Sequence, residues 1–188
     1  MPDGVVPALL ASANPHKLAE LRAALPGWEL DLLARDDYPP ESGATYEDNA
    51  RGKARFGRQH APAGAWVIGE DSGIEASALG GRPGVESARW AEDGVSRIQA
   101  ELAGHADRRG RYVCTIVAID PEGREVVVQG TLEGAILDGP QRGHEGFGYD
   151  PVFVPAGEDA TVAELGDGWK RMNSHRARAA AALAAAVG

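Results

Sequence analysis

The order of apolar and polar positions predicts alternating strands and helices in the first half of the chain. A buried strand is expected over Val5 to Ser12, and the next helix runs to about Ala24 or Leu25, with Asn14 as its N-cap and Pro15 as its first residue. A second helix follows a capping box formed by Thr45 and Asp48 and runs to about Gln59. Further short strands are predicted over Trp28 to Leu33 and Trp66 to Ile68.

The second half of the chain predicts a hairpin and a last helix. Strands over Arg111 to Ile119 and Arg124 to Leu132 flank a turn-forming Asp-Pro-Glu-Gly stretch, and another strand is expected near Ala135. Helices are expected from Val95 to Ala103 and from an N-cap at Ser174 onward. Loops are expected over 35–44, 79–85 and 138–150. Strand–helix alternation followed by a hairpin predicts an α/β fold with a mixed central sheet and flanking helices.

Composition limits the size of the core. Of the 188 residues, 33 are Ala and 25 are Gly, so few large side chains remain to be buried. The net charge of −9 is modest for this length, and the larger apolar residues fall in patterned runs, which favours a folded chain over a disordered one. The length is typical of a single domain, and we expect one over 1–188.

Several classes of protein are excluded at this level. The only cysteine, Cys114, cannot form an internal disulfide. The amino-terminal stretch from Val5 to Ala13 is short and lacks a basic flank, so no signal peptide is expected, and the Ala-rich run from Ala177 to Val187 is too short to span a bilayer. A pI near 5.0 argues against a nucleic-acid polymer as partner. We expect a cytoplasmic protein without membrane contact.

Cations stand at the start of two predicted helices, where the helix dipole disfavours them. Lys17 lies in the first turn of the first helix, and His175 and Arg176 lie in the first turn of the last. Such a helix start suits a bound anion, phosphate above all, because free N–H groups and positive charge converge there. Long side chains that point to solvent are the alternative, and for either helix alone they are the better explanation.

Acidic residues and glycines mark two further candidate sites. Glu70 and Asp71 directly follow a short predicted strand, and Glu41 lies in a Pro- and Gly-rich loop, so these carboxylates suit Mg²⁺ unless they are simply solvated loop acids. The run from Gly146 to Pro151, GFGYDP, allows an aromatic ring to stack on a flat ligand, or forms an ordinary turn. Walker, dinucleotide-binding, zinc-ligand and nucleophile-elbow motifs are absent from the sequence.

Five ordered blocks of sequence then resemble the inosine triphosphate pyrophosphatase family. They are ASANPHKLAEL from Ala11, ESGATYEDNARGKA from Glu41, GEDSGIEASALGGRPGVESAR from Gly69, GFGYDPVF from Gly146 and AELGDGWKRMNSHRARA from Ala163. The resemblance implies two lobes around a nucleotide-binding cleft in a single pyrophosphatase domain. It also implies a Mg²⁺-dependent enzyme, usually a homodimer, that hydrolyses ITP, dITP and XTP to the monophosphate and pyrophosphate, and so keeps deaminated purines out of DNA and RNA.

The resemblance also assigns residues to roles. Asp71 is implied as general base and, with Glu41 and Glu70, as a metal ligand; Glu70 remains an alternative base. Other residues are implied to contact the nucleotide, and they are Ser12, Ala13, Asn14, Pro15, His16, Lys17, Lys53, Ser72, Arg89, Phe147, Gly148, Tyr149, Asp150, Lys170, His175 and Arg176. In the final block, donors from His175 and Arg176 would satisfy a purine 6-oxo group and would meet the 6-amino group of adenine unfavourably.

Two other functions remain open from the sequence. A nucleotide-binding protein that has lost catalysis is disfavoured because the acids at Glu41, Glu70 and Asp71 are all present. A pyrophosphatase for modified pyrimidine nucleotides is disfavoured by the Ser-His-Arg end of the final block, at Ser174 to Arg176. Both make different predictions for an assay with a panel of nucleotides.

Overall fold

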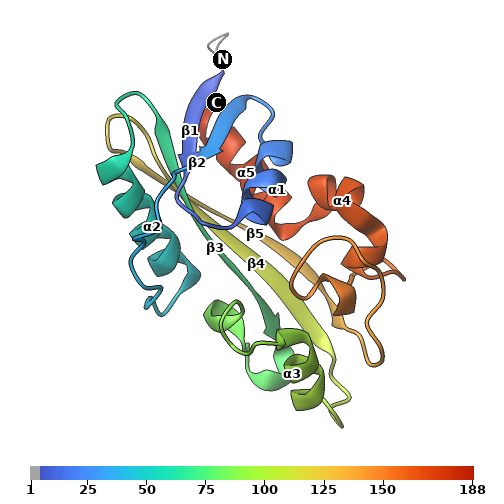
Figure 1. Cartoon of the computed structure of the whole chain (residues 1–188). Coiled ribbons are helices and arrows are strands. Elements are labelled where there is room, and N and C mark those ends of the chain that lie inside the picture. Colours follow the sequence, from blue (N-terminus) through green and yellow to red (C-terminus); the bar gives the residue numbers. More distant parts are fainter. Residues whose placement is uncertain (1–4) are drawn as a thin grey trace. The chain divides into compact units, whose positions relative to one another are not determined.

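The computed structural model describes residues 5–188, which form one mixed sheet with helices around it (Figure 1). Six strands are hydrogen-bonded in the order β2-β1-β3-β4-β5-β6. The strands are β1 (Val6–Leu10), β2 (Trp28–Leu32), β3 (Trp66–Ala76), β4 (Arg109–Ile119), β5 (Glu125–Ile136) and β6 (Phe153–Pro155). The α-helices are α1 (Pro15–Ala24), α2 (Tyr46–His60), α3 (Gly94–Glu101), α4 (Val162–Asn173) and α5 (His175–Val187). The predicted mixed sheet with flanking helices is confirmed.

The described chain divides into two compact units. Unit 1 comprises the chain up to Asp71 together with Cys114–Gly130 and Arg176–Gly188, and unit 2 comprises Ser72–Val113 and Thr131–His175. The residues before Val5, which entered the prediction about a signal peptide, lie outside the described range. Among residues 5–188, no helix combines the length and the apolar character needed to cross a membrane.

Unit 1 begins with a β-α-β arrangement that the sequence predicts well. β1 pairs in parallel with both β2 and β3, as a strand joined to its neighbour through a helix must. Asn14 caps α1, its Oδ1 accepting from the backbone N–H groups of His16 and Lys17. Thr45 and Asp48 form the predicted capping box of α2. These helix starts are local features, so they can be identified from a few residues.

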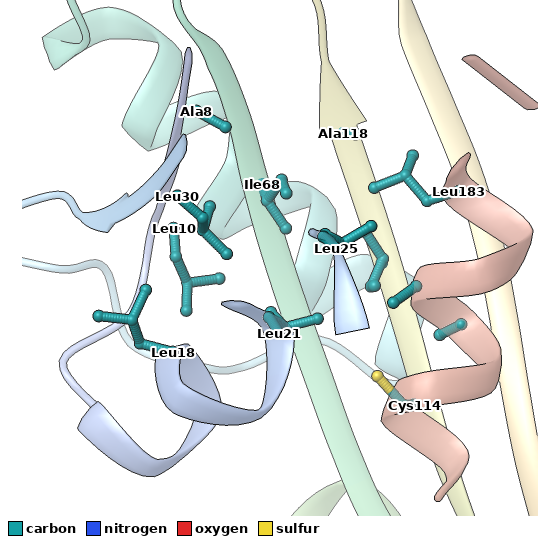
Figure 2. Close-up of a cluster of buried hydrophobic side chains, with 13 residues drawn as sticks. Ala8, Leu10, Leu18, Leu21, Leu25, Leu30, Ile68, Cys114, Ala118 and Leu183 are labelled. Atoms are coloured by element: carbon teal, nitrogen blue, oxygen red, sulfur yellow. The ribbon is translucent and has the colours of Figure 1, made fainter. Parts of the chain in front are cut away.

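The larger core of unit 1 lies between the sheet and helices α1 and α5 (Figure 2). Leu21 and Leu25 of the first helical segment and Leu183 of α5 meet Ile68 of β3 and Ala118 of β4 in one buried cluster. Successive side chains of a strand point to opposite faces. Val117 and Ile119 of β4 accordingly form a separate cluster with Ala50 and Ala54 of α2, which places α2 on the other face of the sheet.

Helix α2 approaches β3 so closely that Gly69 admits no side chain. A Cβ atom built on Gly69 would lie 2.0 Å from the carbonyl oxygen of Ala50 and 2.6 Å from the backbone nitrogen of Ala54. Real Cβ contacts do not occur at such distances. Because Gly69 has no side chain, the backbone of α2 packs directly against β3. This close packing brings the polar side chains of α2 near the residues that follow Gly69.

The core of unit 2 consists mainly of aromatic and aliphatic side chains from its parts of β3, β4 and β5, from helix α3 and from the loops between them. Its buried cluster includes Ile74, Ile98, Tyr112, Tyr149 and Phe153. β6 pairs antiparallel with β5, with Gly134 opposite Pro155. A Cβ atom on Gly134 would lie 2.7 Å from the ring of Phe153, so that glycine makes room for a core aromatic.

Two predictions about the elements are wrong, and one helix was not predicted. β3 does not end at Ile68 but continues to Ala76, so Glu70, Asp71, Ser72 and Gly73 lie within the strand and not after it. The strand expected near Ala135 is the end of β5. Helix α4 was not predicted; its pattern is interrupted by Gly166, which has φ of +78° inside the helical stretch. Ser174 is the C-cap of α4, and the predicted last helix is confirmed because α5 begins at His175, directly after it.

The predicted hairpin is confirmed. β4 and β5 are neighbours in the sheet and are joined through residues 120–124, where Gly123 donates to the carbonyl of Asp120 and Asp120 donates to that of Arg124. A connection of this length joins antiparallel strands only.

Candidate active site

Most of the charged residues expected in the site lie in unit 1, and a first cluster of them surrounds Glu70. The Glu70 side chain is completely buried, and its carboxylate lies 2.7 Å from Nζ of Lys17 and 3.0 Å from Nη2 of Arg176. Arg176 also pairs with Glu20 of α1. Two helix starts that are far apart in the sequence are thus held to one acid in the middle of β3.

This arrangement changes the interpretation of the cationic helix starts. A bound anion and side chains pointing to solvent were the two explanations left open, and the structure shows internal anions, Glu70 for Lys17 and both Glu70 and Glu20 for Arg176. Burial alone would raise the pKa of Glu70, but the charges of Lys17 and Arg176 outweigh it and hold that pKa well below the usual range. Glu70 is therefore ionised at neutral pH, and its charge holds Lys17 and Arg176 in position.

A second cluster joins Lys53 to two of the predicted metal ligands. Nζ of Lys53 lies 3.2 Å from Oδ1 of Asp71, donates to the carbonyl of Glu70 at 3.0 Å, and contacts the carboxylate of Glu41. Burial lowers the pKa of Lys53, but the negative charges of Asp71 and Glu41 raise it by more than burial lowers it. The pKa of Lys53 therefore lies above its ordinary value. Both carboxylates therefore face one permanent cation.

Asn49 of α2 connects these two carboxylate-bearing segments, and sequence reasoning missed it. Its Nδ2 donates to Oδ2 of Asp71 at 3.0 Å, and its Oδ1 accepts from the backbone N–H of Gly43 at 2.8 Å. Gly43 lies two residues after Glu41 in the same loop. The signal in the sequence was a single amide on the helix face that also carries Lys53, which gave no reason to single it out.

The pKa of Asp71 differs in direction from that of its neighbour Glu70. Burial raises the pKa of Asp71, and Lys53 and Asn49 only partly offset this, so the net pKa lies above the ordinary value. The surroundings thus shift the pKa values of these two adjacent acids in opposite directions. Such a pattern distinguishes a carboxylate that stays ionised from one that is able to exchange a proton.

The three predicted metal ligands do not form one group. Within residues 5–188, no set of three or more His, Cys, Asp or Glu side chains is placed to hold a metal ion. Glu41 and Asp71 meet at Lys53, whereas the carboxylate of Glu70 is bonded to Lys17 and Arg176. Mg²⁺ commonly takes only one or two protein carboxylates and completes its shell with water and phosphate oxygens, so the pair of Glu41 and Asp71 suits it by the chemistry of its donors.

The phosphate-binding turn predicted in unit 1 has the expected local form. Ser12 follows β1, and its Oγ accepts from the backbone N–H of Asn14 at 3.1 Å. Ala13, Pro15 and His16 are exposed on the surface of the turn, and Lys17 is half-buried. Backbone N–H groups and an ammonium group therefore lie together at the start of α1.

The remaining predicted residues lie in unit 2, and Asp150 is at their centre. Its Oδ2 accepts from Nζ of Lys170 at 2.7 Å and from the backbone N–H of Phe147 at 2.9 Å, and its Oδ1 accepts from the hydroxyl of Tyr112 at 3.1 Å. Asp150 is buried, and its carboxylate accepts hydrogen bonds from all three of these groups. Lys170 also lies over the ring of Phe147, 4.8 Å from its centroid.

Two aromatic residues of the GFGYDP run differ in exposure. Tyr149 is buried, and its hydroxyl donates to the carbonyl of Ser87 at 3.0 Å, so it belongs to the core of unit 2. Phe147 is half-buried and Gly148, with φ of +62°, is exposed. Of the two rings, Phe147 is the one placed to stack on a ligand.

Three further predicted residues complete unit 2. Ser72 lies in β3, half-buried, and Arg89 is exposed shortly after the 3₁₀ turn at Gly84–Glu86. His175 is buried with its ring stacked on that of Tyr112, centroids 4.6 Å apart and planes within 9°. Tyr112 was missed because its place in an apolar strand indicates core packing and nothing more.

Comparison with known proteins places these residues in a family. The model of the Ham1 family matches residues 8–186. A Gloeobacter violaceus protein named dITP/XTP pyrophosphatase is 43% identical over 176 residues, covering 91% of this chain and 89% of its own length. A protein of the same name from Mycobacterium tuberculosis is 43% identical over 198 residues, covering 97% and 96%.

Solved structures agree. The Staphylococcus aureus Ham1 protein superposes with a TM-score of 0.84 at 34% identity, covering 96% of this chain and 97% of its own. A nucleoside-triphosphatase, dITP/XTP pyrophosphatase, from Mycobacterium abscessus gives a TM-score of 0.73 at 41% identity, covering 95% and 97%.

Proposed function

Because the chain belongs to the Ham1 family, we propose that it is a nucleoside triphosphate pyrophosphatase that hydrolyses the non-canonical purine nucleotides ITP, dITP and XTP to monophosphate and pyrophosphate. The observation that carries the proposal is the match over nearly the whole chain to relatives named dITP/XTP pyrophosphatase. The charges found in unit 1 agree with this chemistry, because phosphoryl transfer is catalysed mainly by positioning and by neutralising charge.

In this proposal the triphosphate is bound by residues of unit 1. The turn from Ser12 to Lys17 offers backbone N–H groups and an ammonium group, and Lys53 adds a second cation. The ion pair with Glu70 fixes the position of Lys17 before substrate binds, so the Lys17 side chain loses less conformational freedom on binding. Arg89 of unit 2 is proposed as a further triphosphate contact, and Ser72 as a contact to the nucleotide.

Glu41 and Asp71 are proposed to hold Mg²⁺. When bound, the ion would neutralise phosphate oxygens and favour loss of a proton from water. Asp71 is proposed as the general base in preference to Glu70, because Glu70 is already committed to two cations and its pKa is depressed. The raised pKa of Asp71 makes it the better proton acceptor of the two.

Base recognition is proposed for Phe147, Gly148, Tyr149, Asp150, Lys170, His175 and Arg176. Among them Phe147 supplies a half-buried ring for stacking and His175 a ring nitrogen for the purine 6-oxo group. Adenine carries an amino group at that position, so it would set a donor against donors and leave buried groups unpaired.

A nucleotide panel tests the activity. The purified protein is incubated with Mg²⁺ and, separately, ITP, dITP, XTP, ATP, GTP and dUTP, and the products are separated by ion-exchange chromatography. We expect monophosphate and pyrophosphate from the first three at rates well above the others. Release of orthophosphate, or ATP consumed as fast as ITP, would contradict the proposal, and preferential use of dUTP would favour a pyrimidine enzyme.

The variant Asp71→Asn separates binding from catalysis. We expect it to abolish turnover while nucleotide binding in the presence of Mg²⁺ persists at reduced affinity, measured by isothermal titration calorimetry, because Glu41 and the substituted amide oxygen can still contact the ion. Full activity in this variant would transfer the role of base to Glu70. Glu75→Gln is a matched control, because Glu75 is an acid of the same strand that pairs with Arg111 in unit 2.

We also propose that the protein acts as a homodimer in the cytoplasm. A dimer interface would add buried surface to a chain that, with 33 Ala and 25 Gly, has few large apolar side chains, without lengthening it. Light scattering at micromolar concentration tests the assembly, and a monomer mass would refute it. The free, buried Cys114 is consistent with a reducing compartment.

A further inference from the structure

Tyr112 of β4 contacts three groups of unit 2 at once. One face of its ring stacks on the imidazole of His175, with centroids 4.6 Å apart and an interplanar angle of 9°. Phe153 packs against it at 4.6 Å with a tilt of 56°. Its hydroxyl donates to Oδ1 of Asp150 at 3.1 Å. Stacking, a tilted aromatic neighbour and a directional hydrogen bond together leave this ring a single orientation.

The ring of Tyr112 therefore fixes the plane of the His175 ring. Both side chains are about nine-tenths buried or more, at 6% exposure each, so water does not compete for these contacts. His175 begins α5, and only its backbone is held by that helix. The stacked ring of Tyr112 therefore constrains the plane in which the ring nitrogens of His175 lie.

Tyr112 also reaches the other proposed base-recognition groups through Asp150. The same carboxylate that accepts from Tyr112 accepts from Lys170 and from the backbone N–H of Phe147. Gly146 is needed for this arrangement, because a Cβ atom there would lie 2.2 Å from Oδ2 of Asp150. One tyrosine thus joins the imidazole on one side to the loop bearing the stacking ring on the other.

We propose that Tyr112 is a positioning residue that sets base selectivity, acting through His175 and Asp150 without contacting the nucleotide. The inference rests on the proposed function of this same site. Discrimination between a 6-oxo and a 6-amino purine requires donors held in a fixed direction, since a donor free to turn away from adenine does not penalise it. Loss of Tyr112 should therefore reduce selectivity more than it reduces the chemical step.

Two variants divide the contacts of Tyr112. Tyr112→Phe keeps the stacked ring and removes only the hydrogen bond to Asp150, whereas Tyr112→Leu removes both the stack and the bond. The control is Ile98→Val, which removes one methyl group from the same buried cluster of unit 2. It reproduces a modest loss of core stability and leaves the side chains of Tyr112, His175 and Asp150 unchanged.

The main measurement is the ratio of kcat/KM for ITP to that for ATP. Loss of one hydrogen bond to a carboxylate corresponds to about tenfold, so Tyr112→Phe should lower the ratio by up to about tenfold and Tyr112→Leu by more. The fall should come from a higher KM for ITP and a gain in ATP use, with kcat for ITP changed little. Ile98→Val should keep the wild-type ratio at a similar loss of Tm.

A spectroscopic readout tests the geometry independently of activity. A ring stacked at 4.6 Å shifts the Cε1–H proton signal of His175 upfield, and this signal is assigned by its absence in His175→Gln. Tyr112→Phe should retain the upfield shift and Tyr112→Leu should lose it. Equal signals in wild type and Tyr112→Leu would overturn the assignment of His175 orientation to Tyr112.

The outcomes separate this inference from the function on which it rests. A wild-type protein that prefers ITP, together with Tyr112 variants that are less stable but equally selective, overturns the role of Tyr112 alone. A wild-type protein that does not prefer ITP to ATP overturns the proposed function and the selectivity role with it. A selectivity loss graded from Phe to Leu, absent in Ile98→Val, supports the inference.

Discussion

Replacing Glu70 by Gln should destabilise the protein strongly, because it removes one charge from a buried cluster that contains two cations. Gln keeps nearly the same shape, so the change isolates the charge. In the wild type, Glu70 is fully buried and bonded to Lys17 and Arg176, and Sγ of Cys114 lies 3.3 Å from its Oε1. In the variant, Arg176 retains Glu20, but the positive charge of Lys17 loses the carboxylate with which it pairs.

The expected cost is about 3–5 kcal/mol, the usual result of removing one partner of a buried ion pair. For a chain of this length each kcal/mol lowers Tm by roughly 2–4 °C, so a fall of about 6–20 °C is expected. Glu125→Gln is the matched control, because Glu125 also bridges two cations, Arg51 and Arg55, but its side chain is 25% exposed. An exposed bridge of that kind contributes about 1 kcal/mol or less.

The pH dependence gives the same experiment a second readout. The pKa of Glu70 in the folded protein is held well below its ordinary value of 4.5, so the stabilisation by its ion pairs is fully present above that value. It is lost as the pH falls through the depressed folded-state pKa. The stability difference between wild type and Glu70→Gln should therefore stay constant from neutral pH to about pH 5 and shrink only below the unfolded-state pKa of roughly 4.3.

Urea unfolding followed by circular dichroism at a series of pH values measures both effects. The reasoning is refuted if Glu70→Gln costs no more than Glu125→Gln at pH 7, or if the difference between wild type and Glu70→Gln changes between pH 7 and pH 5. A variant more stable than wild type would show that desolvation of the three charges outweighs their attraction.

Other predictions concern the packing of α2 and the carboxylates beside it. Gly69→Ala should destabilise by about 1–3 kcal/mol or more, because its Cβ would overlap the backbone of α2, whereas Gly52→Ala on the exposed face of that helix should stabilise by roughly 0.5–1 kcal/mol; thermal unfolding measures both. Asn49→Asp keeps an acceptor for Gly43 but replaces the donor to Asp71 with a second buried carboxylate, so kcat should fall about 10- to 100-fold and Tm should fall as well, and unchanged kcat would exclude a role for that bond. Chelation of divalent cations with EDTA should abolish nucleotide binding as well as turnover, and calorimetric titration that finds the same affinity with and without EDTA would contradict this.

Local signals in the sequence were sufficient for much of the fold. The N-caps at Asn14 and Thr45, and the turn between β4 and β5, each depend on a few neighbouring residues, and all three were predicted correctly. The candidate site was predicted mainly from resemblance, and the residues that the structure adds are those with no chemical signature of their own. Asn49 and Tyr112 are hydrogen-bonded to the predicted residues Asp71 and Asp150, and these contacts become visible only in the structure.

The continuation of β3 through Glu70 and Asp71 could not be predicted from local pattern. Two adjacent acids after three apolar residues are typical of a strand that has reached solvent. Here they remain buried because their counter-charges come from distant parts of the chain, Arg176 lying 106 residues after Glu70 and Lys53 lying 18 residues before Asp71. A buried charge is tolerated when it is paired, and pairing of this kind is a property of the tertiary structure.

The balance of these buried charges also bears on the metal ion that we propose. Around Glu70 and Asp71, the cations Lys17, Lys53 and Arg176 meet the anions Glu20, Glu41, Glu70 and Asp71, so the cluster carries one excess negative charge before any substrate binds. The lysines that would attract a triphosphate are therefore already neutralised from within. A substrate with about four negative charges would be repelled by such a cluster unless a divalent cation accompanied it. In the proposed function, the internal ion pairs would act mainly to hold Lys17 and Lys53 in place, and the net attraction for the nucleotide would come from the ion proposed at Glu41 and Asp71.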